Sequence, residues 1–526
     1  MAHPRLRTFV LWALMGLTPL GAHAQAWLTS DGAWQVAGGN LADTHSSPLV
    51  WQIRPGNAAN LKQKWVFTTT NDVSATPTVE GTAVYVPDWG GMLYRIDSTT
   101  GNPVWSRKLS DYTGKSNSLS RNSPAITPHT IILGDMASAT IMAIDKATGA
   151  LVWQTLLDPL PAALITASPT VLGNIVYASV SSQEEGLATT RPGYVPSFRG
   201  QIAALDLATG KILWTFRTVP VGYTGGSVWG SSMAIDPKRG TLYAGSGDNY
   251  SVPADVDACQ LAAPTPAAES ACLSPDDHID SIMALDLFTG QLKWSRRMVD
   301  ADTYLNACIQ PTRDLPCPDP RGPDYDFGAG PNLYTTTING LLTDIVGAGE
   351  KSGMYWALDP DTGAIIWSTL VGPGGGAGGI EWGTAADGTR VYAAINDSNA
   401  VAYDLAGPNG TVKGWTAGSW AALDAATGKM LWQIPATGKN PLNPALDAGA
   451  LGEMSEAGGV VYAGSMSGDM VAIDAASGNL LWQFASGGSV ICGPSIAMGT
   501  LFWGSGYRRF GSGNNKLYAF TAPTLF

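Results

Sequence analysis

A short motif that recurs along the chain constrains the fold more than any other feature of this sequence. An apolar strand ends in Asp-x-x-(Thr/Ser)-Gly, and a second apolar strand that ends in Trp follows. The motif occurs seven times, with its Asp at Asp97, Asp145, Asp206, Asp286, Asp359, Asp424 and Asp474. The Gly supplies a backbone conformation with positive φ, and the Asp side chain can bond its own turn. Each copy therefore predicts a β-hairpin at the outer edge of a small antiparallel sheet.

The two ends of the chain supply the halves of an eighth copy. Residues 61–67 form a strand with Trp65 near its end but without the turn before it, and Lys516–Phe520 is a strand that lacks the second half. We expect these two strands to complete one sheet and so to close a ring without exposed edges. The Trp series is then Trp65, Trp105, Trp153, Trp214, Trp294, Trp367, Trp432 and Trp482. The prediction is an all-β, eight-bladed β-propeller over residues 61–526, preceded by an irregular lead-in over 25–60.

Composition agrees with this architecture and excludes some functions. Charged residues make up 14% of the chain, against about 25% in ordinary globular proteins. The 63 Gly and 19 Trp indicate a turn-rich β protein. The formal net charge of −12 is not accompanied by a basic stripe, so nucleic acid is not an expected partner.

The first 24 residues predict export. A basic start, a short apolar run and Ala22-His23-Ala24 are typical of a secretory signal cleaved after Ala24. No later segment is expected to span a membrane, so the mature protein is predicted to be periplasmic. In that oxidising compartment Cys259 with Cys272, and Cys308 with Cys317, are plausible local disulfides that leave Cys492 over. None of them begins a Cys-x-x-Cys-His motif, so no covalently attached haem is encoded.

Five loop motifs make the repeat more specific. They are Ser-Ser-Gln-Glu-Glu at 181–185, Phe-Arg-Gly at 198–200, Gly-Pro-Asp-Tyr-Asp-Phe-Gly-Ala at 322–329, Gly-Glu-Lys-Ser-Gly at 349–353 and Gly-Gly-Ile-Glu-Trp at 378–382. With them the chain resembles the pyrroloquinoline quinone (PQQ)-dependent alcohol dehydrogenases, and within that group the polyvinyl alcohol dehydrogenase branch. The resemblance implies PQQ and Ca²⁺ as cofactors and a small-molecule or polymeric alcohol, above all a secondary one, as substrate. It also implies transfer of electrons to a separate acceptor such as a soluble cytochrome c.

The resemblance also implies which residues hold a flat quinone with three carboxylates. Trp229 matches the tryptophan on which the cofactor stacks, although another wedge between blades is the alternative interpretation. Arg121 matches an arginine that pairs with a cofactor carboxylate, and Lys351 matches the basic residue beside the quinone oxygens. The remaining positions predicted to bind the cofactor are Thr166, Ser181, Glu381 and Trp382.

Oxygen ligands for calcium are implied in the same way. Glu184 matches the family's glutamate ligand, with a solvated acidic loop at Glu184 and Glu185 as the alternative. Either Asp248 or Asn249 can supply the second ligand. Asp326 matches the catalytic aspartate, which serves as general base and metal ligand, and Asp324 is the competing base. Gly328 stands where lanthanide-dependent relatives carry a further Asp, so calcium is the expected metal.

Two departures and two alternatives remain. Many relatives carry adjacent cysteines above the quinone, whereas this chain has Pro196-Ser197 at the corresponding place, so another wall must cover the cofactor. Residues 374–379 satisfy Gly-x-Gly-x-x-Gly, but no helix is expected after them, so we reject a dinucleotide site. The alternative functions are a non-catalytic scaffold in outer-membrane assembly and a PQQ-dependent sugar or aldehyde dehydrogenase.

Overall fold

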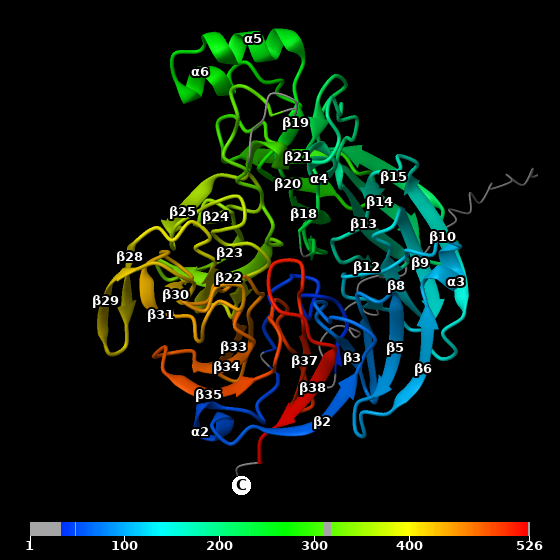
Figure 1. The fold of residues 1–526 in the computed structure, drawn as a ribbon, viewed down its shortest axis with the longest axis vertical. Helices are drawn as coiled ribbons and strands as arrows, with labels where there is room; N and C mark the ends of the chain where they lie inside the picture. Colours follow the sequence, from blue (N-terminus) through cyan, green and yellow to red (C-terminus); the bar gives the residue numbers. More distant parts are fainter. Residues whose placement is uncertain (1–32, 48, 231, 310–316, 524–526) are drawn as a thin grey trace, which may run out of the picture.

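A computed structural model describes residues 33–47, 49–230, 232–309 and 317–523. The predicted signal at 1–24 lies outside these residues. Eight four-stranded antiparallel sheets are arranged around a central axis, as the ribbon shows (Figure 1). The predicted eight-bladed propeller is therefore confirmed.

The strands follow the chain blade by blade. The first blade holds β3 (Thr78–Glu80), β4 (Ala83–Pro87), β5 (Met92–Asp97) and β6 (Pro103–Lys108), with β1 (Ala33–Trp34) paired to β3. The second holds β7 (Ala125–Ile126), β8 (Thr130–Gly134), β9 (Ala139–Asp145) and β10 (Leu151–Asp158). The third holds β12 (Thr170–Leu172), β13 (Ile175–Ser182), β14 (Gln201–Asp206) and β15 (Ile212–Arg217), with β11 (Ala163–Leu164) paired to β13. The fourth holds β17 (Ala234–Asp236), β18 (Thr241–Gly245), β20 (Ser281–Asp286) and β21 (Leu292–Arg297).

The second half of the ring repeats the pattern. The fifth blade holds β22 (Asn332–Ile338), β23 (Leu341–Gly349), β24 (Met354–Leu358) and β25 (Ile365–Leu370). The sixth holds β26 (Ala385–Ala386), β27 (Arg390–Ile395), β30 (Ser419–Asp424) and β31 (Met430–Pro435). The seventh holds β32 (Ser455–Ala457), β33 (Val460–Gly464), β34 (Asp469–Asp474) and β35 (Leu480–Ala485). The eighth holds β36 (Ser495–Ala497), β37 (Thr500–Ser505), β38 (Lys516–Thr521) and β2 (Lys62–Thr68).

The eighth blade closes the ring as predicted. Strand β38 pairs with β37 on one side and with β2 on the other, and Ala519 lies opposite both Phe502 and Trp65. The last blade therefore takes its outer strand from the beginning of the chain.

The repeated turn locks each blade to the one before it. In the sixth blade Asp424 accepts hydrogen bonds from the backbone N–H of Thr427 at 2.9 Å and from its hydroxyl at 2.7 Å. The indole of Trp367, from the preceding blade, donates to the carbonyl of Ala425 at 3.1 Å. The same indole-to-turn bond leaves Trp65, Trp105, Trp153, Trp214, Trp294, Trp432 and Trp482, the last of which reaches the carbonyl of Leu61.

The lead-in is more than an irregular approach to the ring, because it runs along the inner strands. Its carbonyl groups accept hydrogen bonds from inner-strand N–H groups of five blades. The pairs are Ile126 to Gln35, Ile235 to Leu41, Leu333 to Ala42, Ala386 to Thr44 and Glu456 to His45. Together with the pairing of β1 and β3, the segment 33–46 thus bonds to six of the eight blades. The short helix α2 (Pro55–Ala58) then leads the chain outward to β2.

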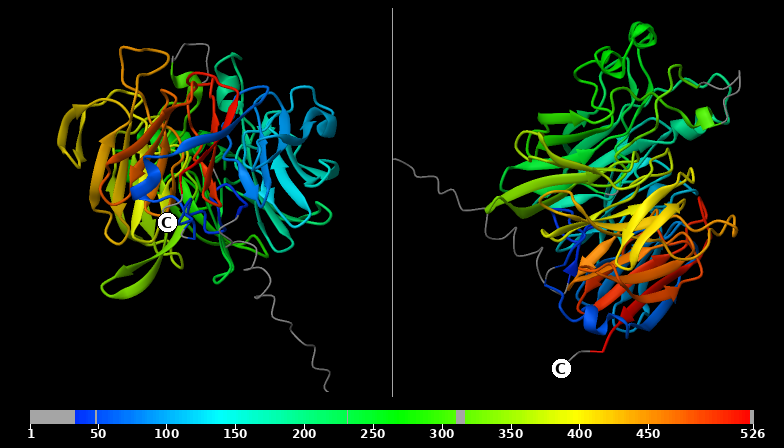
Figure 2. Two further views of the ribbon diagram at one scale, coloured as in Figure 1. Left: turned by 90° about the horizontal axis from the view of Figure 1, so that it is seen from below. Right: turned by 90° about the vertical axis from the view of Figure 1, so that its left-hand side faces the viewer.

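Insertions carry the remaining elements. The ribbons are β16 (Thr224–Gly225) with β19 (Asn249–Ser251), and β28 (Tyr403–Gly407) with β29 (Gly410–Trp415). The helices are α3 (Ser110–Thr113), α4 (Glu184–Ala188), α5 (Ala254–Ala262), α6 (Pro266–Ser270) and the 3₁₀ turn η2 (Asn306–Ile309). Helices α5 and α6 project beyond the ring (Figures 1 and 2). Among the described residues, no helix is long and apolar enough to cross a membrane.

Both predicted disulfides are present. Cys259 is bonded to Cys272, which ties α5 to the chain after α6, and Cys308 is bonded to Cys317. Cys492 is buried and unpaired. Burial raises the pKa of the Cys492 thiol to about 12, so this residue is an inert part of the core.

Candidate active site

The candidate residues gather at one end of the ring for a topological reason. Each second strand of a blade ends at the face where the chain enters the first strand of the next blade. Glu185, Asp248 and Lys351 follow β13, β18 and β23, whereas Trp229 and Asp326 precede β17 and β22. Both kinds of position therefore lie at the same end of the propeller, close to its axis.

Three carboxylates meet there. Oxygen atoms of Glu185, Asp248 and Asp326 all lie within 4.8 Å of one another. Both side-chain oxygens of Asp248 are buried without a hydrogen-bond partner. Burial, followed by the charge of Asp326, raises the pKa of Glu185 to about 7. Burial, followed by the charge of Glu185, raises the pKa of Asp248 well above its ordinary value. Such a cluster is costly without a cation, and oxygen ligands of this kind suit a hard divalent ion.

One predicted ligand, Glu184, lies outside the carboxylate cluster, whereas its neighbour Glu185 lies in it. Glu184 is buried, but its oxygens accept hydrogen bonds from the backbone N–H of Ser197 at 3.0 Å and of Phe198 at 2.8 Å, and from the hydroxyl of Tyr194 at 2.9 Å. Glu184 and Glu185 begin α4, where consecutive side chains point in different directions. Glu185, and not the predicted Glu184, therefore joins the carboxylate cluster.

Asp248 and Asn249, the two candidates for the second ligand, have different partners. The side-chain amide of Asn249 donates to Asp277 at 2.8 Å, which turns it toward the loop after α6. Asp248 lies in the carboxylate cluster, and the side-chain oxygen of Asn249 is buried without a hydrogen-bond partner. Asn249 contributes instead to the backbone of the insertion, where its N–H donates to the carbonyl of Asp302 at 3.1 Å.

The predicted base and the predicted lysine are in contact. One oxygen of Asp326 accepts hydrogen bonds from the indole of Trp229 at 2.7 Å and from Nζ of Lys351 at 2.9 Å, and the other accepts from the backbone N–H of Asp248 at 2.9 Å. Lys351 Nζ also bonds Asp324 at 2.6 Å. Burial lowers the pKa of Lys351, but Asp324 and Asp326 outweigh it and hold that pKa well above its ordinary value. Lys351 is therefore a permanent cation in the site.

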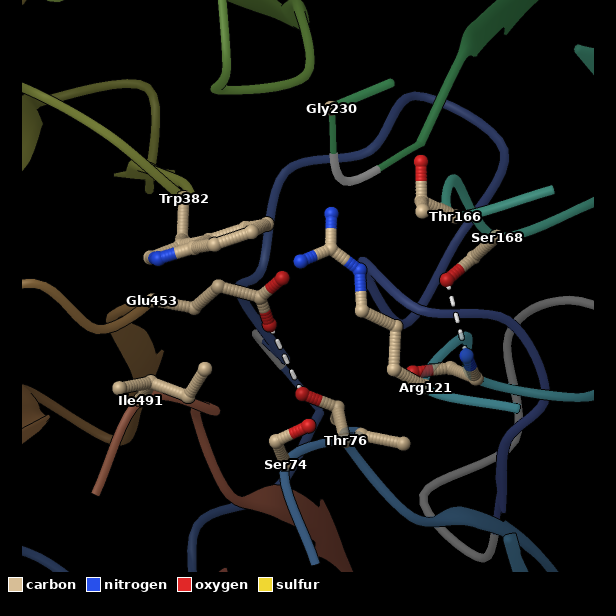
Figure 3. A pocket seen from close by; sticks show the side chains of 11 residues that line it. Ser74, Thr76, Arg121, Thr166, Ser168, Gly230, Trp382, Glu453 and Ile491 are labelled. Carbon is tan, nitrogen blue, oxygen red and sulfur yellow. Dashed lines mark hydrogen bonds between the residues drawn. The ribbon is translucent and has the colours of Figure 1, made fainter. Parts of the chain in front are cut away.

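Aromatic rings form a second part of the site. Trp229 and Trp382 meet edge to face with their ring centroids 5.4 Å apart. Nζ of Lys351 lies 5.1 Å from the ring centroid of Trp229, and the guanidinium of Arg121 lies 4.3 Å from that of Trp382. The hydroxyl of Thr166 donates to the backbone carbonyl of Trp229 at 2.9 Å. Figure 3 shows Arg121, Trp382 and Thr166 around one cavity.

The other predicted contacts are placed around this group. Burial lowers the pKa of Arg121 to about 10 and raises that of Glu381 to about 7. Glu381 Oε2 and the indole Nε1 of Trp382 are buried without a hydrogen-bond partner. In the β11–β13 ladder Ser181 pairs with Leu164, and Leu164 lies two residues before Thr166. The unpaired indole N–H of Trp382 and the two cations, Arg121 and Lys351, fit a planar polyanionic group.

The cavity itself measures about 30 Å³, which is room for about one water molecule. At the edge of the cavity, the guanidinium of Arg121 lies over the ring face of Trp382.

Further residues of the cavity escaped the sequence prediction. Thr76 donates its hydroxyl to Glu453 at 2.8 Å, and both line the cavity together with Ser168 (Figure 3). Ser123 lines the cavity as well. The sequence does contain a signal for these residues, which is their position relative to the strands. Each lies two residues before the first strand of its blade, whereas Arg121 and Thr166 lie four residues before β7 and β12. Alignment of the blades by register therefore points to these positions, whereas a search for known motifs does not.

The closed ring, its turn-to-indole locks and the acidic, aromatic centre define a propeller built from quinoprotein-type repeats. The chain belongs to the PQQ_2 family, described as "Outer membrane protein assembly factor BamB", which it matches over residues 28–246 and 416–524.

Individual relatives are more specific. The chain is 32% identical over 394 residues to a polyvinylalcohol dehydrogenase of Sphingopyxis sp. (strain 113P3), covering 71% of this chain and 54% of that protein. It is 30% identical over 468 residues to a polyvinylalcohol dehydrogenase of Pseudomonas sp., covering 84% and 65%. The chain thus spans between half and two thirds of the length of these relatives. The predicted resemblance to quinoprotein alcohol dehydrogenases is confirmed.

A solved structure shares the fold. The quinohemoprotein alcohol dehydrogenase from Comamonas testosteroni superposes with a TM-score of 0.69 at 21% identity, over 94% of this chain and 81% of that one.

Proposed function

We propose that this protein is a PQQ- and calcium-dependent dehydrogenase that oxidises secondary alcohol groups, in small molecules or in a polymer, in the periplasm. The observation that carries the proposal is the cluster of Glu185, Asp248 and Asp326 beside Lys351 and the two indoles. The names of the relatives supply the substrate class. Electrons leave to a separate acceptor such as a soluble cytochrome c.

The residues divide the chemistry among them. Glu185, Asp248 and Asp326 would hold Ca²⁺ through carboxylate oxygens. Trp229, Trp382, Arg121, Thr166 and Glu381 would hold PQQ, which when bound supplies the acceptor for hydride. Ser181 is the remaining residue that we expect to contact PQQ.

Asp326 takes the proton of the alcohol hydroxyl as general base. The indole N–H of Trp229 and the ammonium of Lys351 both point at one of its oxygens, so they fix the carboxylate in one orientation. Lys351 also stabilises negative charge that develops in the site during oxidation. Asp324 shares the ammonium of Lys351 and balances its charge when Asp326 becomes protonated.

Reconstitution tests the proposal. The mature protein is mixed with PQQ and CaCl₂, and cofactor binding is followed by absorbance while dye-linked oxidation is measured with primary and secondary alcohols, sugars and aldehydes. We expect oxidation of secondary alcohols that Asp326→Asn lowers by about 100-fold or more while PQQ remains bound. Asp324→Asn serves as the matched variant and retains turnover.

Three other results would contradict the proposed function or a part of it. Turnover that survives in Asp326→Asn but not in Asp324→Asn moves the base to Asp324. Preference for sugars or aldehydes replaces the substrate class. Absence of both PQQ binding and activity favours a scaffold in outer-membrane assembly, in keeping with the description of the family.

A further inference from the structure

A second cavity lies on the outer flank of the propeller, away from the axis. The β28–β29 ribbon leans against β31 at the rim (Figure 1) and forms one wall with residues 407–412. The end of β31 and the residues after it, 434–437, form another wall, and residues 478–480 of the next blade form the third. The cavity measures about 400 Å³, which is within the range of sites for small ligands.

The lining of this cavity is uncharged and largely apolar. Val412, Ile434, Pro435 and Leu480 contribute apolar side chains, and none of the described residues that line it carries a charge. Leu480 is 44% exposed, so the cavity is open to a ligand from outside. A charged ligand would find no counter-ion here, which restricts the occupant to neutral molecules with an apolar skeleton.

Two buried donors in the lining have no partner. Trp420 is fully buried, and its indole Nε1 makes no hydrogen bond. The hydroxyl of Thr437 is buried and unpaired as well. Both residues line the cavity. A buried donor without an acceptor costs free energy, and an indole N–H can only donate, so the complementary ligand carries oxygen acceptors on its apolar skeleton.

The cavity is linked to the active-site face through Thr437. The carbonyl of Thr437 accepts hydrogen bonds from the hydroxyls of Ser465 at 2.7 Å and Ser467 at 2.9 Å. Between these serines, Met466 packs in the same apolar cluster as Trp382 of the candidate site. The wall of the cavity at Thr437 is therefore connected, through Ser465 and Ser467, to the apolar cluster that contains Trp382.

We propose that this cavity is an anchoring subsite for a chain of a polymeric secondary alcohol. A backbone of alternating CH₂ and CHOH groups is neutral, packs its carbon skeleton on Val412, Ile434 and Leu480, and offers hydroxyl oxygens to Trp420 and Thr437. The subsite rests on the proposed function, because it serves the same substrate. Binding of one part of a polymer at the flank raises the effective concentration of its other alcohol groups at the catalytic centre.

Direct binding to the protein without PQQ tests the subsite independently of catalysis. Polyvinyl alcohol of defined length is titrated calorimetrically into the wild type, Thr437→Val and Leu480→Arg. Leu341→Arg, at an exposed leucine of β23 outside the cavity, is the matched control. We expect Thr437→Val to weaken polymer binding about 3- to 10-fold, as the loss of one hydrogen bond predicts. Leu480→Arg should weaken it at least as much, and Leu341→Arg should leave it unchanged.

Kinetics of the reconstituted enzyme supply the second readout. Both cavity variants should raise KM for the polymer by the same factors, with kcat unchanged and with KM for pentane-2,4-diol unchanged. Polymer binding that depends on Thr437 and Leu480 in a protein without dehydrogenase activity leaves the subsite standing and removes the proposed function. Oxidation of small alcohols with no polymer binding, or with binding that neither variant alters, overturns the subsite and leaves the proposed function standing.

Discussion

Two adjacent glutamates at the start of α4 lie in different surroundings, and the resemblance implied the first of them, Glu184, as the metal ligand. The carboxylate of Glu184 is fully used by hydrogen bonds from the loop at 194–198. The carboxylate of Glu185 faces Asp248 and Asp326. The resemblance located this acidic pair, but the direction of each side chain depends on where the short helix begins. At that boundary the hydroxyl of Ser182 accepts a hydrogen bond from the N–H of Glu184 at 2.9 Å.

The two glutamates can be told apart by matched substitutions. We expect Glu185→Gln to weaken calcium binding by about tenfold or more, because it removes a charged ligand. Glu184→Gln should leave calcium affinity near that of the wild type but lower the free energy of unfolding by about 1–3 kcal/mol, because backbone N–H groups lose a charged acceptor. Calorimetric titration with calcium in the presence of PQQ, and denaturant unfolding, measure the two effects. The reverse assignment of effects would return Glu184 to the metal site.

At the scale of the element, the turn glycines have a second reason to be glycine. Gly428 has φ of +71°, and a Cβ there would lie 2.4 Å from the ring of Trp367. Gly173, in the turn between β12 and β13, has φ of +58°, but a Cβ would meet nothing within 4 Å. The repeat predicted the positive φ at the turn, whereas the contact with the indole of the neighbouring blade depends on the packing between blades.

This pair of glycines separates backbone strain from steric conflict. Gly173→Ala should lower the free energy of unfolding by about 1–2 kcal/mol through strain alone. Gly428→Ala adds overpacking against Trp367, so we expect a total loss of about 2–5 kcal/mol. Denaturant unfolding of both variants gives the comparison. Equal losses of unfolding free energy would mean that the interface between the blades accommodates the added methyl group at this contact without a free-energy cost.

The lead-in segment carries a buried acid whose effect depends on pH. Burial raises the pKa of Asp43 to about 7, although the hydroxyl of Ser232 lowers it somewhat by donating a hydrogen bond. Since the pKa is raised on folding, the stability contributed by this group is complete below about pH 4. It is lost as the pH rises toward 7.

Asp43→Asn should remove this dependence of stability on pH. The variant should match the wild type near pH 4 and become the more stable protein above pH 7, by up to roughly 4 kcal/mol for a shift of about three units. Asn tolerates the positive φ of 54° at this position and keeps an acceptor for Ser232. Denaturant unfolding at pH 4.5, 7 and 8.5 follows the difference. A difference that is the same at all three values would show that Asp43 does not titrate with folding.

At the scale of the whole molecule, the sequence predicted the ring because the two ends of the chain supply the halves of one further copy of the repeat. Eight tryptophans and the two half-motifs at the ends were sufficient for the number of blades and for the closure by β2 and β38. The path of the lead-in along the inner strands was not predictable, because it depends on backbone hydrogen bonds that no side-chain pattern records. The convergence of Arg121, Trp229, Asp326, Lys351 and Trp382 on one end of the axis follows from the alternation of strands once the ring is known.

Closure makes the stability of the ring depend on a strand that is far from the site. Ala519 lies in β38 between β2 and β37, so Ala519→Pro removes a hydrogen bond and distorts both seams at once. Thr411→Pro makes the same change in β29, whose ribbon is not part of the ring. We expect Ala519→Pro to cost about 3 kcal/mol or more and to release two blade edges. Thr411→Pro should leave the main calorimetric transition within a few degrees of the wild type. Similar transitions in both variants would mean that the seam between the two ends of the chain contributes no more than a peripheral ribbon, and the ring would then owe its stability to the blade interfaces alone.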